Sequence, residues 1–218
     1  SLEALNRRLD PFFEPPEDEK WIRLTTHNAQ ADAINRKEMD ELDTEEKVFE
    51  ADISGSFPET AYPAETSLSL KVGAQVMFIR NDSKAGRWYN GKVGTVSALD
   101  EDLRVMFEDG TEVSVEKEEW NNLRYELNSE SNEIEAAVEG VFVQYPLRLA
   151  WAITIHKSQG LTFDRVIIDA GKAFSFGQVY VALSRCRSLE GIVLTTPISS
   201  RCTFFSPEVN SFEKTYTP

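Results

Sequence analysis

A short polar segment between two apolar, β-branched runs constrains this chain more than any other feature. Residues 152–155 and 166–168 have the composition of strands that are covered on both faces of a parallel sheet. The residues that follow the first run are His156, Lys157, Ser158, Gln159 and Gly160. They are therefore predicted to lie at the carboxyl end of a strand, where ligands bind in open α/β sheets. An ordinary connecting loop is the alternative interpretation.

A second strand-to-helix junction is predicted near the start of the chain. Residues 21–26 alternate as in a strand, and the apolar residues that follow at helical spacing are Ala31, Ile34 and Leu42. This pattern predicts a helix that runs to about Asp43. Asn28 is predicted to cap its N-terminus, because the amide oxygen can accept from the free N–H groups of the first turn. Capping alone and phosphate binding at this helix N-terminus remain alternatives.

The middle of the chain has the pattern of short antiparallel strands. Residues 51–66 are predicted to form a loop or linker, and beyond them the apolar residues at every second position are Val72, Ala74, Val76 and Phe78. Asp109-Gly110 between two alternating runs predicts a two-residue hairpin turn. About 60 such residues predict a small barrel inserted between two α/β segments, with strand-and-helix patterning resuming at Val141.

A buried helix is predicted near the end of the chain. Its apolar face is formed by residues at i, i+3, i+4 and i+7, namely Val179, Ala182, Leu183 and Cys186. Ser175 is predicted to cap its start, and the residues from Gly191 to Thr195 read as a following strand. Gln178 and Arg185 are seven residues apart, which places them on the same face of a continuous helix.

The charge distribution excludes binding of nucleic acid by bulk attraction. The formal net charge is −14, and it falls mostly on residues 1–66 (−10), less on 67–130 (−4) and not on 131–218 (0). The neutral last segment leaves room for a local phosphate groove. Cys186 and Cys202, with only two histidines in the chain, give neither a disulfide framework nor a zinc site, which fits a reducing cytoplasm. We interpret both cysteines as small buried hydrophobic residues.

The remaining sequence signals argue against a membrane or secretory role. No apolar run reaches the roughly 20 residues that a transmembrane helix needs, and residues 1–8 do not have the layout of a signal peptide. The chain begins without methionine inside a polar helical stretch, which suggests a fragment of something longer.

Arg185 is the strongest candidate for a catalytic side chain. Its planar guanidinium suits the oxygens of a nucleotide γ-phosphate and can stabilise charge in phosphoryl transfer. A surface arginine pair with Arg187 near a helix C-terminus is the alternative. The sequence contains no G-x-x-x-x-G-K-[ST] phosphate loop, and the segment Gly171-Lys172-Ala173 lacks both the earlier glycine and the hydroxyl. We therefore predict that this chain alone does not hydrolyse ATP.

Three segments together resemble the later motifs of superfamily-one DNA helicases of the Pif-one and RecD-like group, which track 5′ to 3′. They are LTTHNAQADAIN, AWAITIHKSQGLTFDRVIID and GQVYVALSRCRSLEGI. LKVGAQVMFIRND with WYNGKVGTV resembles the SH3-like barrel inserted in the second RecA-like domain of that group. The implied fold is α/β, a RecA-like parallel-sheet domain of the P-loop NTPase type with an inserted antiparallel SH3-like barrel. The implied limits are 1–66 and 131–218 for the RecA-like domain and 67–130 for the barrel.

The resemblance also implies roles for individual residues. Arg185 matches the γ-phosphate arginine, and the other residues that match the nucleotide cleft are Gln159, Gly160 and Gln178. Those that match the DNA-facing motifs are Thr26, His27, Asn28, Thr154, His156, Lys157 and Ser158. Asn81, Asn90 and Gly91 match recurrent barrel positions, and the two asparagines are assigned to DNA binding. We interpret the adjacent Trp88 and Tyr89 as barrel packing, with base stacking as the alternative.

The implied function is the C-terminal motor domain of an ATP-dependent DNA helicase. Its cofactors are ATP and Mg²⁺, bound mainly by a first RecA-like domain of the same polypeptide, and its other partner is single-stranded DNA. The resemblance also implies a role in DNA repair, recombination and telomere maintenance. The alternatives are a non-catalytic adaptor that binds protein or nucleic acid, and a RecD-like subunit of a helicase–nuclease complex.

Overall fold

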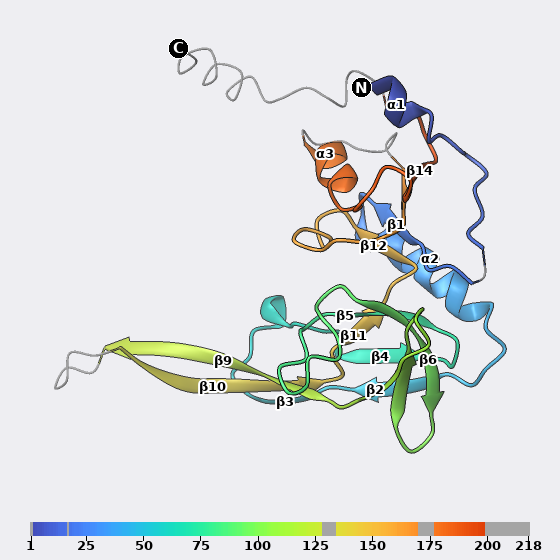
Figure 1. Cartoon of the computed structure of the whole chain (residues 1–218). Helices are drawn as coiled ribbons and strands as arrows, with labels where there is room; N and C mark the ends of the chain where they lie inside the picture. Colours follow the sequence, from blue (N-terminus) through green and yellow to red (C-terminus); the bar gives the residue numbers. More distant parts are fainter. Residues whose placement is uncertain (1, 17, 128–133, 170–176, 199–218) are drawn as a thin grey trace, which may run out of the picture. The chain divides into compact units, whose positions relative to one another are not determined.

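The structure is a computed structural model that describes residues 2–16, 18–127, 134–169 and 177–198 (Figure 1). Packing of the backbone divides the chain into two compact units. Unit 1 contains Ser1–Asp40 and Ala150–Pro218, and unit 2 contains Glu41–Leu149. Unit 2 is therefore an insertion, in sequence, between two segments of unit 1.

Unit 1 is built on a parallel four-stranded sheet with the order β12-β1-β13-β14. Its strands are β1 (Ile22–Thr25), β12 (Ala152–Thr154), β13 (Val166–Ile168) and β14 (Ile192–Leu194). Every residue of β12, β13 and β14 is buried, as the continuous β-branched runs predict for a sheet covered on both faces. The mixed α/β class with a parallel sheet is confirmed.

Helix α2 (Asn28–Asp40) connects β1 to unit 2 and packs beside β12 (Figure 1). Asn35 fastens it to the sheet, because its side-chain amide donates to the Ala152 carbonyl at 2.9 Å and accepts the Ala152 N–H at 2.8 Å. The helix is confirmed, but Asn28 is its first residue and not its cap. The Ala31 N–H reaches back to the His27 carbonyl at 3.3 Å, so the helical bonding already includes residue 27.

The outer edge of the sheet is covered by the start of the chain. Helix α1 (Leu2–Asn6) leads into Leu9, which forms a parallel bridge with Leu194 of β14. The Asn6 side chain exchanges two hydrogen bonds with the backbone of Ile198, at 2.8 and 3.0 Å. These contacts tie the first ten residues of unit 1 to its last described strand.

Helix α3 (Gln178–Leu183) is shorter than predicted. Val179 and Ala182 are buried, as its apolar spacing predicts, but the helix ends at Leu183 with Ser184 as its C-cap. Gly177 is the N-cap residue, and the predicted cap Ser175 lies outside the described residues. Cys186 follows the helix as a half-buried free thiol that donates to the Asp164 carbonyl at 3.3 Å. Cys202 lies outside the described residues.

Unit 2 contains an antiparallel five-stranded sheet with the order β11-β5-β6-β7-β8. Its strands are β5 (Gln75–Phe78), β6 (Val93–Leu99), β7 (Leu103–Met106), β8 (Glu112–Val115) and β11 (Leu147–Leu149). The predicted hairpin joins β7 to β8. Its turn is longer than two residues, because Phe107 pairs with Thr111 around Gly110, which has a φ of +80°.

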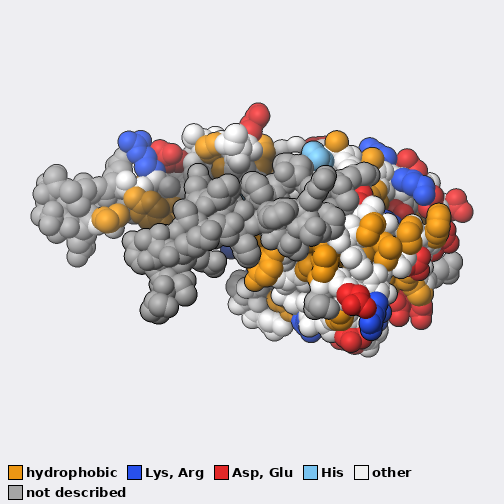
Figure 2. All heavy atoms as spheres, turned by 90° about the horizontal axis from the view of Figure 1, so that it is seen from above, with side chains coloured by type: hydrophobic (Ala, Val, Ile, Leu, Met, Phe, Trp, Pro, Cys, Tyr) orange, Lys and Arg blue, Asp and Glu red, His pale blue; other side chains and the backbone are white. Residues whose placement is uncertain are grey.

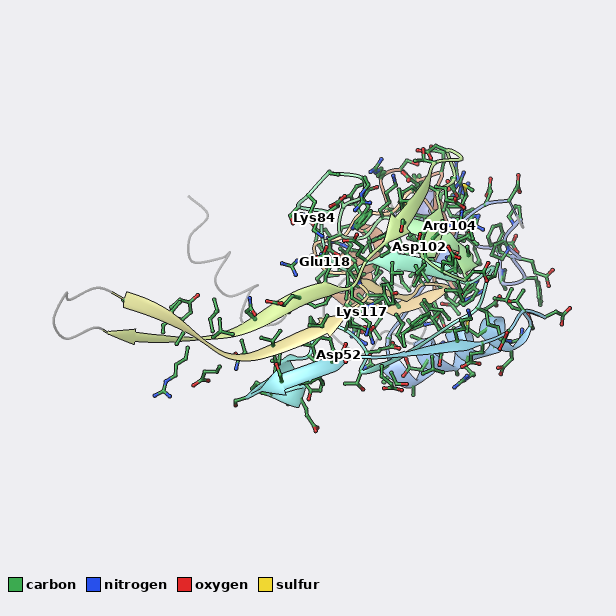
Figure 3. All side chains as sticks on the ribbon, turned by 90° about the horizontal axis from the view of Figure 1, so that it is seen from below. Asp52, Lys84, Asp102, Arg104, Lys117 and Glu118 are labelled. Atoms are coloured by element: carbon green, nitrogen blue, oxygen red, sulfur yellow. The ribbon has the colours of Figure 1, made fainter. Side chains whose placement is uncertain are left out.

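Two smaller antiparallel sheets complete unit 2. One pairs β3 (Asp52–Gly55), β10 (Ile134–Gln144) and β9 (Glu118–Leu127), and the other pairs β2 (Lys47–Glu50) with β4 (Ser67–Leu70). The β9–β10 hairpin extends well beyond β3 (Figure 1). Lys117, at the root of β9, donates to the Asp52 carboxylate at 3.2 Å, and the two side chains lie together in Figure 3.

The boundaries between the two units differ from the predicted domain limits. The change from unit 1 to unit 2 lies after Asp40, not after residue 66, and the return lies after Leu149, not after residue 130. The predicted loop at 51–66 contains β3 and the 3-10 helix η1 (Glu59–Ala61), and Val141 continues β10. Pairing of β2 with β4, and of β3 with β10, holds these residues in unit 2. Across the described ranges, no helix is long and apolar enough to span a bilayer.

Candidate nucleotide- and DNA-facing edge

The carboxyl ends of β1 and β12 place two of the predicted motifs side by side. Thr25 and Thr154, the last residues of these strands, are register partners. The Ile155 N–H continues the pairing by donating to the Thr25 carbonyl at 2.8 Å. The turns that begin at residues 26 and 155 therefore leave the sheet at the same edge, as the parallel topology requires.

Two buried hydroxyls build the turn after β12. The Thr154 hydroxyl accepts the Lys157 N–H at 3.2 Å, and the Ser158 hydroxyl donates to the Ile155 carbonyl at 2.7 Å. Thr154 is 5% exposed and Ser158 is fully buried. The contact with DNA that the sequence predicts for these two side chains stays a prediction. They satisfy peptide groups inside the turn, which is a common use of short hydroxyl side chains.

The same turn exposes the other members of its motif. His156, Lys157 and Gln159 are exposed, and Gly160 has a φ of +80° with open space where a side chain would begin. A histidine side chain lies at the surface in the space-filling view of Figure 2, in which neither His27 nor His156 is labelled. The turn thus presents a cation and hydrogen-bonding groups on a backbone that its own hydroxyls hold in place. These are the groups that contact phosphate oxygens without reading sequence.

The turn after β1 is organised by a short chain of contacts. The Thr26 hydroxyl lies 2.8 Å from Nδ1 of His27, and the buried Thr25 hydroxyl donates to the His27 carbonyl at 3.2 Å. His27 and Asn28 are exposed at the start of α2, and Thr26 is half-buried. The histidine ring is therefore held at the same sheet edge as the turn after β12.

Arg185 lies against the turn that follows β12. Its Nη1 donates to the Leu161 carbonyl at 3.1 Å and reaches the Ser158 carbonyl at 3.5 Å. Its Nε donates to the Val181 carbonyl at 3.1 Å. A single guanidinium thus connects the end of α3 to the turn that carries Lys157.

The guanidinium keeps some capacity for a ligand. Nη2 donates to the Ser184 hydroxyl at 2.9 Å in an exposed position, which leaves one of its two N–H groups without a partner among the described residues. The arginine is half-buried, and its orientation is fixed by backbone acceptors. The Arg185 guanidinium is therefore preorganised for an anion that binds beside it.

Gln178 does not share a helical face with Arg185. It is the half-buried first residue of α3, and the helix ends two residues before Arg185. The Arg185 N–H donates to the Ala182 carbonyl at 3.1 Å, and its carbonyl accepts the Phe163 N–H at 2.7 Å. This pairing with residue 163 takes the chain out of the helix, so the seven-residue spacing no longer places the two side chains on one face.

Asn81 and Asn90 belong to unit 2, and they contact each other. The Asn81 side-chain oxygen accepts the Asn90 N–H at 2.7 Å, which closes the loop between β5 and β6. Within that loop Trp88 is 4% exposed and stacks on Phe78 with 4.4 Å between the ring centroids. The packing role predicted for Trp88 is confirmed, and Tyr89 beside it is 47% exposed.

Sequence reasoning missed two residues that support these loops. Asp82 is buried in the β5–β6 loop, and its carboxylate accepts the Arg87 Nε at 2.6 Å and the N–H groups of Lys84, Ala85 and Arg87. Ser184 accepts from Arg185 and donates to the Val181 carbonyl at 2.8 Å. Asp82 opens a run of polar residues and glycine, which is a turn signal. No sequence pattern predicts the hydrogen bond between Ser184 and the neighbouring arginine.

The described residues offer no metal site of their own. Within them, no three His, Cys, Asp or Glu side chains come together in a group able to hold a metal ion. The donors at the edge of the sheet are suited to anions.

Comparison with known proteins shows which family shares the residues of this edge. Residues 149–193 match the family model of the UvrD-like helicase C-terminal domain. This range contains β12, β13 and α3, together with the turn at 155–160 and Arg185.

Individual relatives match nearly the whole chain. The chain is 38% identical over 206 residues to the ATP-dependent DNA helicase Pif1 of Bdellovibrio bacteriovorus, with 92% of this chain covered. It is similar to the unliganded structure of Pif1 from Bacteroides sp, with 40% identity, a TM-score of 0.88 and 99% of this chain covered. The Bacteroides Pif1 complex with ADP-AlF3 and ssDNA gives 40% identity, a TM-score of 0.73 and the same coverage.

These relatives are longer than this chain. The chain spans 44% of the Bdellovibrio protein, 50% of the unliganded Bacteroides structure and 49% of the complexed one.

Proposed function

Because this chain is a homologue of the Pif1 DNA helicases in their C-terminal region, we propose that it is the second motor domain of an ATP-dependent DNA helicase. In this proposal unit 1 is the second RecA-like domain, and unit 2 contains the SH3-like insertion. The activity belongs to the whole protein, in which a first RecA-like domain supplies the phosphate loop and the site for Mg²⁺. Movement along DNA is 5′ to 3′, as in the group that the motifs resemble.

Arg185 is the residue that carries the proposal. Its guanidinium presents an N–H of Nη2 toward solvent, and backbone carbonyls fix its plane. An arginine in this state stabilises the charge that develops on a γ-phosphate when another domain holds the nucleotide. Gln159 and Gly160 lie in the turn that Arg185 contacts, which supports their assignment to the same cleft.

We propose a DNA-facing set that is smaller than the set predicted from the sequence. We assign phosphate contacts to the exposed His27, Asn28, His156 and Lys157, and a supporting role to the buried Thr154 and Ser158. Thr26 contributes by holding His27. Asn81 and Asn90 close a loop of unit 2 and have no part in the track that we propose.

The contact between Arg185 and the 155–160 turn suggests how the two activities are linked. Any shift of the guanidinium toward an anion stretches its bonds to the Leu161 and Ser158 carbonyls. Those carbonyls border the turn that presents Lys157, so the position of the phosphate grip depends on whether a nucleotide is bound. This is the coupling that a motor needs.

Substitution of Arg185 in the full-length protein tests the proposal. Arg185→Ala should reduce ATP turnover about 10³-fold or more and leave affinity for single-stranded DNA nearly unchanged. Arg185→Lys is the matched control for charge, and it should recover little, because a lysine cannot reproduce the planar fork. Near-normal turnover of the alanine variant would exclude the assigned role.

A further inference from the structure

Unit 2 carries a surface pocket of about 500 Å³ that the proposed motor function does not use. Its walls come from the segment around η1, from the residues after β5 and from the start of β9. The residues that line it include Phe57, Pro63, Arg80, Glu119, Trp120 and Asn121. The start of β9 is marked by Glu118 in Figure 3.

The apolar part of the pocket is formed by packed aromatic rings. Trp120 packs edge-on against the fully buried Phe142, with 6.1 Å between the ring centroids, and Phe57 lies 5.8 Å from the same ring. Trp120 and Phe57 are themselves half-buried, so each keeps part of its ring open. With Pro63 they form an apolar surface that is already in place before any ligand arrives.

Arg80 belongs to the wall of the pocket and is already occupied. Its guanidinium lies 5.3 Å from the centre of the Trp120 ring. Its Nη1 donates to the Glu119 carbonyl at 2.6 Å and lies 3.5 Å from the Glu118 carboxylate. These contacts hold the indole in place and neutralise the arginine, so Arg80 is not a free cation for phosphate.

The free charge around the pocket is negative. Glu119 is exposed on its rim, and its carboxylate has no ion-pair partner among the described residues. Unit 2 as a whole holds 23 acidic and 10 basic residues, a net charge of −13, whereas unit 1 holds 14 and 13, a net charge of −1. Almost the entire net negative charge of the chain therefore belongs to the unit that carries this pocket, which disfavours nucleic acid and favours a basic ligand.

We propose that the pocket binds an extended, proline-rich segment of a partner protein that carries a basic side chain. Proline rings pack on Trp120, Phe57 and Pro63. The carbonyls of a polyproline-type segment have no partners of their own and accept from the exposed Asn121 amide. An arginine of the segment pairs with Glu119. Such a segment loses little conformational entropy when it binds, so a small contact surface is enough to hold it.

The test uses the whole chain and defined probes. The first probe is a capped ten-residue peptide of eight prolines with an arginine at each end, and the second has glutamate in place of both arginines. Calorimetry at low salt should show binding of the arginine peptide at least tenfold tighter than the glutamate peptide. Trp120→Ala should abolish binding of the arginine peptide. Glu119→Gln should lower the affinity for the arginine peptide about fivefold or more.

Controls separate this result from misfolding and from binding to DNA. Tyr125→Ala, an exposed ring on β9 that does not line the pocket, should leave peptide affinity unchanged. Trp120→Phe keeps an aromatic ring and should retain part of the affinity if the fold is intact. The proposal is overturned if the arginine peptide does not bind, if Glu119→Gln has no effect on its binding, or if a thymidine decamer displaces it.

Discussion

At the scale of single residues, Asp82 shows how a buried charge fixes the conformation of a loop. Its side chain is 1% exposed, and it accepts the Arg87 side chain at 2.6 Å and three backbone N–H groups. The Arg87 guanidinium, helped by those N–H groups, holds the pKa of the Asp82 carboxyl well below its usual range. Asn81, Trp88 and Asn90 all belong to the loop that this carboxylate organises.

Stability against pH follows from this lowered pKa. A carboxyl with a lowered folded-state pKa stabilises the protein above its unfolded-state pKa of about 3.9, and this contribution is lost as the pH falls below that value. Asp82→Asn should cost roughly 1–3 kcal/mol of unfolding free energy at pH 7. The deficit should shrink below pH 4, as measured by urea denaturation. Glu3→Gln, which removes an exposed ion pair with Arg7, is the control, and its unfolding free energy should depend on pH as in the wild type. A loss of unfolding free energy in Asp82→Asn that stays the same at every pH would contradict the account.

At the scale of elements, the turn after β12 divides its motif into two groups. Thr154 and Ser158 face inward and bond to the backbone, and Lys157 between them is exposed. The turn is thus held by its hydroxyls and presents its cation.

Lys157→Ala should weaken binding of the full-length protein to single-stranded DNA equally for all sequences. Loss of one phosphate contact should lower the slope of log affinity against log salt by about 0.7. Fluorescence anisotropy with labelled oligonucleotides measures both quantities. Lys37→Ala, near the other end of α2, is the matched control and should change neither. An unchanged salt slope for Lys157→Ala would remove this residue from the track.

Elements that depend on local composition could be predicted from the sequence. The β-branched runs identify β12 and β13, because strands that are buried on both faces consist mainly of such residues. The alternation of residue types at 21–26 identifies β1. The inward orientation of Ser158 could not be predicted, because it depends on how the turn closes. The place of Val141 in β10 depends on pairing with Asn121 and Ser54, which lie 20 and 87 residues away. The end of α3 at Leu183 likewise depends on the pairing of residues 163 and 185.

At the scale of the whole molecule, charge separates the two units. Unit 1 is nearly neutral and contains the edge with Lys157 and Arg185, and unit 2 holds a net charge of −13. The candidate DNA-binding edge therefore lies on the unit that does not repel phosphate. Unit 2 is suited to a basic partner and not to the nucleic acid backbone.

The 218-residue chain alone should therefore be a weak DNA binder and an inactive enzyme. It lacks a phosphate loop, so phosphate release from ATP should not exceed the buffer rate, with or without single-stranded DNA. Binding to a labelled oligonucleotide should be detectable at low salt and should be lost as salt rises. Sustained ATP turnover by this chain would mean that it contains a nucleotide site of its own.

The central claim is that one guanidinium connects the nucleotide cleft to the DNA-facing turn. The most direct measurement is the affinity of the full-length protein for single-stranded DNA with and without ADP–aluminium fluoride, in the wild type and in Arg185→Ala. In the wild type the nucleotide analogue should change DNA affinity by about 5-fold or more, within the usual range of coupling between sites. In the variant this change should disappear, while affinity without nucleotide stays the same. An unchanged response of the variant, at saturating analogue, would contradict the claim.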